Sequence, residues 1–190
     1  MSALVLVRHS VPKMLPDVLD SQWPLSVLGR TLCAEAAEAV QPYEPAIIAT
    51  SPMRRAVETA SIIGKRLEVA SRTVPGLEEH HRHNAGSLTG GQFQASIAAF
   101  FAEPDSLVFG EETGNQAYER FASTVQTIKQ EYPYRNIAVV SHGTVISLFV
   151  ARVAGIDAQS VWKSLTQPSV IVLDTDQQQL VRLVRFPTKG

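Results

Sequence analysis

Short apolar runs alternate along the chain with longer segments in which apolar residues recur at helical spacing. Apolar runs of this length are typical of strands covered on both faces, and they lie at residues 3–7, 46–50 and 136–142, with a further candidate strand at 69–74. Between these strands the spacing predicts helices at residues 27–40, 52–67, 93–102, 117–132 and 144–155.

Residues that cap helices mark the ends of several of these segments. Ser26 precedes the first predicted helix as an N-cap residue, and Ser51 followed by Pro52 predicts the start of the second. Gly155 closes the last predicted helix.

The order of the elements predicts the fold. Strands and helices alternate up to residue 155, and two runs of alternating polarity at 169–176 and 179–186 then predict a closing antiparallel pair. We therefore expect an α/β fold with three α/β/α layers, in which a mostly parallel sheet carries an antiparallel edge. A chain of 190 residues is expected to form one domain over residues 1–190.

Composition narrows the class of protein. A hydrophobic content of 45% with 18% charged residues argues against disorder, and a net charge of −1 argues against a broad nucleic-acid-binding or polybasic membrane surface. The apolar run at the N-terminus ends at Arg8, too short for a signal peptide or membrane span, so a cytoplasmic location is expected. The single cysteine, Cys33, lies in a helical pattern and is expected to serve packing.

Three of the predicted strands lead into residues that carry chemistry. The first runs directly into Arg8 and His9, the second leads to Arg55 in the first turn of a helix, and the run at 136–142 ends in His142. Ligands of parallel sheets gather at the carboxyl ends of the strands, so these side chains are expected to share one rim. Arginines and a helix N-terminus favour an anion, and one imidazole is then available as a nucleophile.

Several motifs occur in an order that spans nearly the whole chain. "LVRHS", "SPMRRAVETA" and "SHGTVI" resemble the patterns of the histidine phosphatase superfamily, also called the phosphoglycerate-mutase-like family. "PLSVLGR" and "GEETGNQAYERF" are similar to two further stretches of that family. The resemblance implies a phosphoglycerate-mutase-like fold with one histidine phosphatase domain.

The resemblance also implies roles for residues. His9 resembles the nucleophile that becomes phosphohistidine, and Glu79, in "LEE", resembles the general acid/base, with Glu78 as the alternative. The expected phosphate clamp and substrate contacts are formed by Arg8, Arg55, His142 and Gly143.

The sequence departs from the family pattern near the nucleophile. Ser10 stands where the family usually has glycine, Pro12 where it has threonine, and Leu15 where it has asparagine. One or two phosphate contacts must then come from elsewhere, and Ser10 and Asn84 are the candidates.

The stretch "EEHHRHN", residues 78–84, allows two interpretations. Its histidines and glutamates are of metal-ligating types, but it lacks the H-E-x-x-H spacing, so we expect no metal and no cofactor. The favoured interpretation is a loop that lines the site with cationic groups. Arg54 is expected to be a solvated charge on its helix, and Arg120 to anchor the "GEE" loop through an ion pair.

The function implied is a metal-independent phosphatase that hydrolyses a phosphomonoester of a small anionic metabolite through a phosphohistidine intermediate. A phosphomutase of the same family is an alternative, although the chain is short for one. A non-catalytic phosphate-binding regulatory domain is a third possibility, which the departures near His9 keep open.

Overall fold

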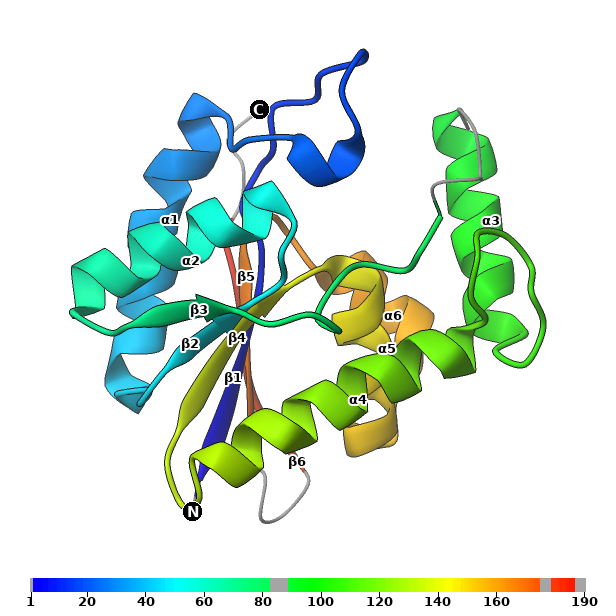
Figure 1. Ribbon diagram of the computed structural model, residues 1–190. Helices are drawn as coiled ribbons and strands as arrows, with labels where there is room; N and C mark the ends of the chain where they lie inside the picture. Colours follow the sequence, from blue (N-terminus) through cyan, green and yellow to red (C-terminus); the bar gives the residue numbers. More distant parts are fainter. Residues whose placement is uncertain (1, 83–88, 175–178, 187–190) are drawn as a thin grey trace.

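One six-stranded sheet forms the centre of the molecule (Figure 1). The computed structural model describes residues 2–82, 89–174 and 179–186. The strand order is β3-β2-β4-β1-β5-β6. The strands are β1 (Ala3–Arg8), β2 (Ile48–Thr50), β3 (Ser71–Thr73), β4 (Ile137–Ser141), β5 (Ser169–Asp174) and β6 (Gln179–Arg185).

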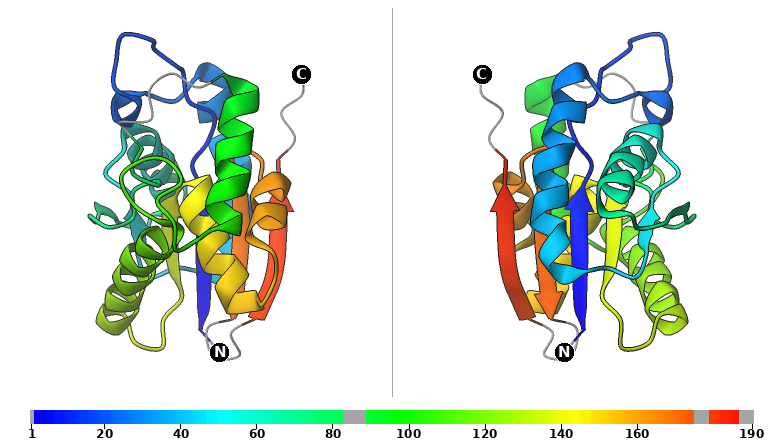
Figure 2. Two further views of the ribbon diagram at one scale, coloured as in Figure 1. Left: turned by 90° about the vertical axis from the view of Figure 1, so that its right-hand side faces the viewer. Right: turned by 90° about the vertical axis from the view of Figure 1, so that its left-hand side faces the viewer.

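The register confirms a mostly parallel sheet with an antiparallel edge. β1 pairs in parallel with β4, which pairs in parallel with β2, and β2 pairs in parallel with β3. β5 runs antiparallel to both β1 and β6, which Figure 2 shows as arrows of alternating direction. The carboxyl ends of β1, β2 and β4 therefore meet at one rim.

Helices cover both faces of the sheet, which confirms the three layers (Figure 1). Side chains alternate between the faces of β1: Leu4 and Leu6 join one core cluster, and Val5 and Val7 join the other. On the first face lie α3 (Gly90–Ala102), α4 (Gly114–Glu131), α5 (Gly143–Ala154) and α6 (Ala158–Ser164), and on the second lie α1 (Val27–Val40) and α2 (Arg54–Leu67).

Two helix starts differ from the prediction. α2 begins at Arg54 with Met53 as N-cap residue, so the expectation that Ser51 caps it was wrong. The hydroxyl of Ser51 instead accepts a hydrogen bond from the Met53 N–H and is also bonded to a histidine of the neighbouring strand end. α3 begins at Gly90, earlier than expected, because Thr89 forms a capping box with Gln92.

Other helix predictions were confirmed. The side chain of Ser26 accepts a hydrogen bond from Gly29 N–H at the start of α1, and Gly155, with φ 65°, ends α5. In the described part of the chain, none of the helices is long and apolar enough to cross a membrane.

Candidate active site

The imidazole of His9 lies just after β1, buried at the carboxyl rim of the sheet. Its Nδ1 is 2.8 Å from the carbonyl oxygen of Ser10, and its Nε2 is 3.1 Å from Nε of Arg55. A carbonyl only accepts and a guanidinium only donates, so Nδ1 carries the proton and the lone pair of Nε2 accepts a hydrogen bond from Arg55. Burial and the charge of Arg55 hold the pKa of His9 well below its usual value, so the ring is neutral.

Arg55, the second residue of α2, is positioned by the helix and by the loop before α1. Its Nη1 donates to the carbonyl oxygen of Asp20, and its Nη2 is 3.6 Å from the Asp20 carboxylate. The guanidinium is buried and lies against His9, while the Asp20 carboxylate is about one-third exposed. The structure thus places Arg55 beside the predicted nucleophile, with an acidic neighbour on its other side.

His142 follows β4 and lies next to His9. The two ring centroids are 5.0 Å apart in an edge-to-face arrangement. Nε2 of His142 is 2.8 Å from the hydroxyl of Ser51, which holds the ring in place. Burial, followed by the neighbouring His9, keeps the pKa of His142 well below its usual value, so this ring is neutral as well.

Arg8 lies at the end of β1 and packs against the first residue of α5. Its Nη1 donates to the carbonyl oxygen of Leu165 at 3.0 Å. A Cβ atom on Gly143 would come within 3.1 Å of the guanidinium carbon of Arg8, so the missing side chain of Gly143 makes room for the cation. The role that the structure supports for Gly143 is therefore steric.

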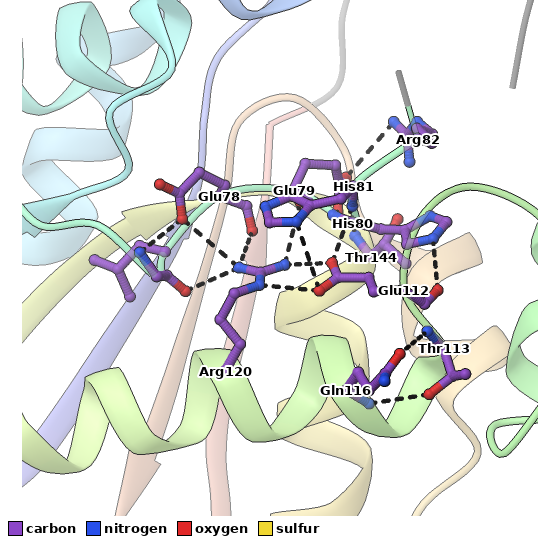
Figure 3. A network of polar contacts seen from close by, with 12 residues as sticks. Glu78, Glu79, His80, His81, Arg82, Glu112, Thr113, Gln116, Arg120 and Thr144 are labelled. Carbon is purple, nitrogen blue, oxygen red and sulfur yellow. Dashed lines mark hydrogen bonds and ion pairs between the residues drawn. The ribbon is translucent and has the colours of Figure 1, made fainter. Parts of the chain in front are cut away.

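The adjacent carboxylates Glu78 and Glu79 separate onto two sides of their segment (Figure 3). Glu79 is buried, and its oxygens accept hydrogen bonds from the backbone N–H groups of His80 (2.9 Å) and Thr144 (3.3 Å). Glu78 accepts from the backbone N–H of Gly76 at 2.7 Å. The bond to Thr144 places Glu79 at the start of α5, the helix that follows His142.

Arg120 holds this segment in position, and its ion pair with Glu112 confirms the predicted anchoring of the "GEE" loop. Figure 3 shows Arg120 projecting from α4 between Glu78 and Glu112. It binds the Glu112 carboxylate through Nε and Nη2 and donates to the carbonyl oxygens of Gly76, Glu78 and Glu79. Five hydrogen bonds from one guanidinium thus fix the backbone on which Glu79 stands.

The pKa of Glu79 in the ligand-free site lies below its ordinary value. Burial raises this pKa, but the guanidinium of Arg82 and the two backbone N–H groups outweigh burial. A general acid must carry a proton at the first step, and this lowered pKa does not provide one in the ligand-free site. The proton that Glu79 donates must then arrive with the substrate, or after the negative charge of the substrate has entered the site.

One of the two candidate phosphate contacts, Ser10, is not supported. Ser10 is fully buried, and its hydroxyl donates to the carbonyl oxygen of Gly29 at 2.7 Å, so its one proton is used away from His9. Asn84 lies outside the described residues. Pro12 forms an isolated bridge with Leu25 and supplies no donor side chain.

Neighbouring charges and histidines have other partners. Arg54 is exposed, as predicted, and its Nε forms an ion pair with Glu58. His80 is buried between the rings of Phe100 and Phe109, with centroid distances of 4.2 and 4.7 Å. Within the described segments, no group of three or more His, Cys, Asp or Glu side chains could hold a metal ion, and the absence of a metal stays a prediction.

Sequence reasoning missed several residues that the fold brings to the site. Thr144 holds Glu79, Ser51 holds His142, Asp20 pairs with Arg55, and Nη2 of Arg82 lies 3.9 Å from Glu79. Arg82 stood within the loop predicted to be cationic. Ser51 and Thr144 lie within the motifs "SPMRRAVETA" and "SHGTVI" but were assigned no contact at the site, and Asp20 lies in no motif.

Five buried side-chain atoms have no hydrogen-bond partner among the residues that the structure describes. All five belong to this site or its immediate surroundings: Arg8 Nε, His80 Nδ1, Arg82 Nη1, His142 Nδ1 and Thr144 Oγ1. Buried polar atoms are normally paired, and four of these atoms can donate a proton without altering the charge of their side chain. This concentration of unpaired donors beside a neutral imidazole is suited to an anion.

The comparisons with known proteins agree on one protein family. The model of the histidine phosphatase superfamily (branch 1) matches residues 4–186. The chain is 25% identical over 164 residues to the uncharacterized phosphatase PhoE of Bacillus subtilis, covering 84% of this chain and 81% of PhoE. It is 27% identical over 165 residues to glucosyl-3-phosphoglycerate phosphatase of Mycobacterium tuberculosis, covering 78% and 73% of the two chains.

Solved structures share the fold. The native structure of mycobacterial glucosyl-3-phosphoglycerate phosphatase has a TM-score of 0.74 at 25% identity, covering 97% of this chain and 98% of that one. The alpha-ribazole phosphatase from Shigella flexneri has a TM-score of 0.72 at 19% identity, covering 99% and 100% of the two chains, and shows likeness of fold alone.

Proposed function

Because the chain belongs to the histidine phosphatase superfamily, we propose that it is a phosphoric monoester hydrolase that acts on a small phosphorylated metabolite through a phosphohistidine intermediate. The observation that carries the proposal is the neutral His9, whose unprotonated Nε2 lies among buried cations and unpaired donors. The relatives named phosphatases favour hydrolysis over phosphoryl transfer between two positions of a substrate.

In the first step, Nε2 of His9 attacks phosphorus and the bond from phosphorus to the ester oxygen breaks. Positive charge develops on the imidazole as the N–P bond forms, and the Ser10 carbonyl oxygen, 2.8 Å from Nδ1, stabilises that charge. Arg55 Nε, which donates to Nε2 in the empty site, is released to a phosphoryl oxygen. When Arg55 binds the phosphoryl group, it therefore also frees the Nε2 lone pair of His9 for attack.

The phosphoryl group is held by charge and by aimed donors. Arg8 and Arg55 supply two guanidinium groups, and His142 donates from Nδ1 when the Ser51 hydroxyl donates to its Nε2. Donors that are already in place at a buried site stabilise the spread charge of the transition state without reorganisation. We propose on this ground that the reaction needs no metal ion.

Glu79 is proposed to protonate the leaving alkoxide and then to remove a proton from water. A phosphomonoester loses its second proton near pH 6, so part of the substrate enters as a monoanion that carries the required proton. The added negative charge of the bound phosphoryl group raises the pKa of Glu79 and favours transfer of this proton to its carboxylate. Water then attacks phosphohistidine, the N–P bond breaks, and His9 regains its lone pair.

The proposal is tested by measuring phosphate release from p-nitrophenyl phosphate and from a panel of alkyl phosphomonoesters, with and without EDTA. We expect turnover that EDTA leaves intact, with phosphate released into solution. Loss of activity in EDTA and rescue by a divalent ion would contradict the metal-free reaction. Binding of phosphate without any turnover would instead support a non-catalytic domain, and transfer of the phosphoryl group within the substrate would support a mutase.

A further inference from the structure

Arg82 is a cation of the site that neither the proposed chemistry nor a structural ion pair fully uses. Its side chain is about one-quarter exposed, and its Nη2 lies 3.9 Å from the Glu79 carboxylate, at the limit of an ion pair. Its Nη1 is buried and has no partner within the described segments. Figure 3 shows Arg82 beyond Glu79, on the side away from Arg120.

The guanidinium of Arg82 is held in a fixed orientation. Its central carbon lies 5.1 Å from the ring centroid of Phe93, a cation–π distance, and the Phe93 ring is 6.3 Å from that of Trp162. An arginine that rests on an aromatic face loses less freedom when it binds a ligand. The free Nη1 and the weakly paired Nη2 therefore form a fork that is prepared for a further acceptor.

The charges of the site are asymmetric around His9. Asp20 lies on the Arg55 side, where a second anion would meet a like charge, whereas the other side carries Arg82. The charge of Arg82 reaches the nucleophile: after burial, which is the main cause, it is one of the cations that lower the pKa values of His9 and His142. A further anion is thus favoured on the side of Arg82 once Glu79, whose carboxylate is the like charge on that side, carries the proton that it donates.

We propose that Arg82 is a specificity-determining residue that binds a second anionic group, a carboxylate or a further phosphate, carried by the leaving alcohol. This inference rests on the proposed function, because Glu79 must face the leaving oxygen if it protonates that oxygen. Nη2 of Arg82 lies 3.9 Å from the Glu79 carboxylate, so a group attached close to the ester oxygen comes within its reach. The planar fork of arginine matches a carboxylate or phosphate in a bidentate manner.

Competitive inhibition of p-nitrophenyl phosphate hydrolysis by three phosphonates tests the proposal. Methylphosphonate carries one anionic group, phosphonoacetate adds a carboxylate, and methylenebisphosphonate adds a second phosphonate. At mildly alkaline pH we expect one of the last two to bind the wild-type protein about 10–100-fold more tightly than methylphosphonate, as for hydrogen bonds between charged groups. The tighter of the two identifies which anion the site accepts.

Variants assign this preference to Arg82. The affinity ratio compares the tighter of the last two phosphonates with methylphosphonate. Arg82→Gln should reduce this ratio to within about threefold of unity. Arg82→Lys, which keeps the charge and loses the planar guanidinium, should give an intermediate ratio. The ratio cancels effects that are common to all three ligands, including any change at Glu79. Arg66→Gln removes an exposed arginine at the end of α2 and should keep the wild-type ratio.

Two results would overturn the inference: a wild-type ratio near one, or a full wild-type ratio in folded Arg82→Gln or Arg82→Lys protein. If Arg82→Gln does not fold, the wild-type ratio and the lysine variant still decide. The proposed function fails separately, because it would be contradicted by a wild-type protein that hydrolyses no phosphomonoester. Hydrolysis of p-nitrophenyl phosphate without preference among the phosphonates contradicts the role of Arg82 alone.

Discussion

Replacing Glu79 by glutamine separates its chemical contribution from its structural one. Both carboxylate oxygens accept a backbone N–H, from His80 at 2.9 Å and from Thr144 at 3.3 Å. The amide has one accepting oxygen, which should keep the shorter bond, while its NH₂ group meets the N–H of Thr144. One buried donor is then left unpaired, at a cost to the free energy of unfolding of about 1 kcal/mol, the low end for such a loss.

The expected loss of catalysis is much larger. Removing a general acid typically slows a reaction by about 10²–10⁴-fold, which corresponds to about 3–5 kcal/mol of the activation barrier. A domain with an ordinary stability of about 5–15 kcal/mol stays folded after a loss of about 1 kcal/mol, so unfolding does not account for a rate change of this size. The loss should depend on the leaving group, since p-nitrophenolate leaves without a proton.

The assay compares kcat/KM for an alkyl phosphate and for p-nitrophenyl phosphate. Glu79→Gln should slow the alkyl ester severely and the aryl ester much less. Glu78→Gln is the matched control: it removes one charge from the next residue, whose carboxylate lies 3.7 Å from Arg120, and should be mild on both substrates. Equal losses on both substrates in Glu79→Gln, or a leaving-group-dependent loss in Glu78→Gln instead, would refute the assignment.

Three further changes are expected. His9 and His142 have lowered pKa values in the folded protein and bind a proton more readily when it is unfolded, so the thermal unfolding midpoint should fall as the pH drops below about 6.5. Over the same range kcat/KM for an aryl phosphate should show no titration of these two imidazoles. A thermal midpoint that does not change between neutral and mildly acidic pH would contradict the lowered pKa values. Arg120→Met leaves the buried Glu112 carboxylate without its partner and should lower the free energy of unfolding in denaturant titrations by about 3 kcal/mol. Arg66→Met, which removes an exposed ion pair, should lower it by less than about 1 kcal/mol. Similar losses in the two variants would count against the anchoring role of Arg120. Burial raises the pKa of Cys33 to about 11, so iodoacetamide should alkylate it in urea but not in the folded protein, and rapid labelling of the folded protein would be inconsistent with its burial.

Much of the fold was predictable because the strands are uninterrupted apolar runs. The runs around Leu6 and Val139 are buried on both faces, so their composition alone indicates interior strands. Helix α6 was not predicted, because its seven residues are too few to establish a helical period. The start of α2 was misplaced because the Ser51 hydroxyl, a typical capping group, is bonded to His142 at the site.

The site was predictable where a strand end fixes a residue. His9 and His142 follow the parallel neighbours β1 and β4, so the topology alone brings their rings together. The alternation of an extended segment also separated Glu78 from Glu79 correctly. The contacts of Arg82 were not predictable, because they depend on how the loop after β3 meets α3.

The pKa of Glu79 shows why residue types alone were insufficient. Burial by itself would raise it, but Arg82 and the backbone N–H groups of His80 and Thr144 reverse the direction. Similarly, Ser10 donates to the carbonyl oxygen of Gly29 because the chain after β1 packs against α1. The contacts of Glu79 with Thr144 and of Ser10 with Gly29 join residues that are distant in the sequence, and residue types alone do not reveal them.

The central claim is that His9 forms a covalent bond to phosphorus. Rapid quenching after brief incubation with a substrate labelled in its phosphoryl group should trap a phosphoenzyme that is labile in acid and stable in base, with the label on His9. His9→Ala should abolish both the label and turnover, while Glu79→Gln should still accumulate label from p-nitrophenyl phosphate. A label that persists in His9→Ala would contradict the account.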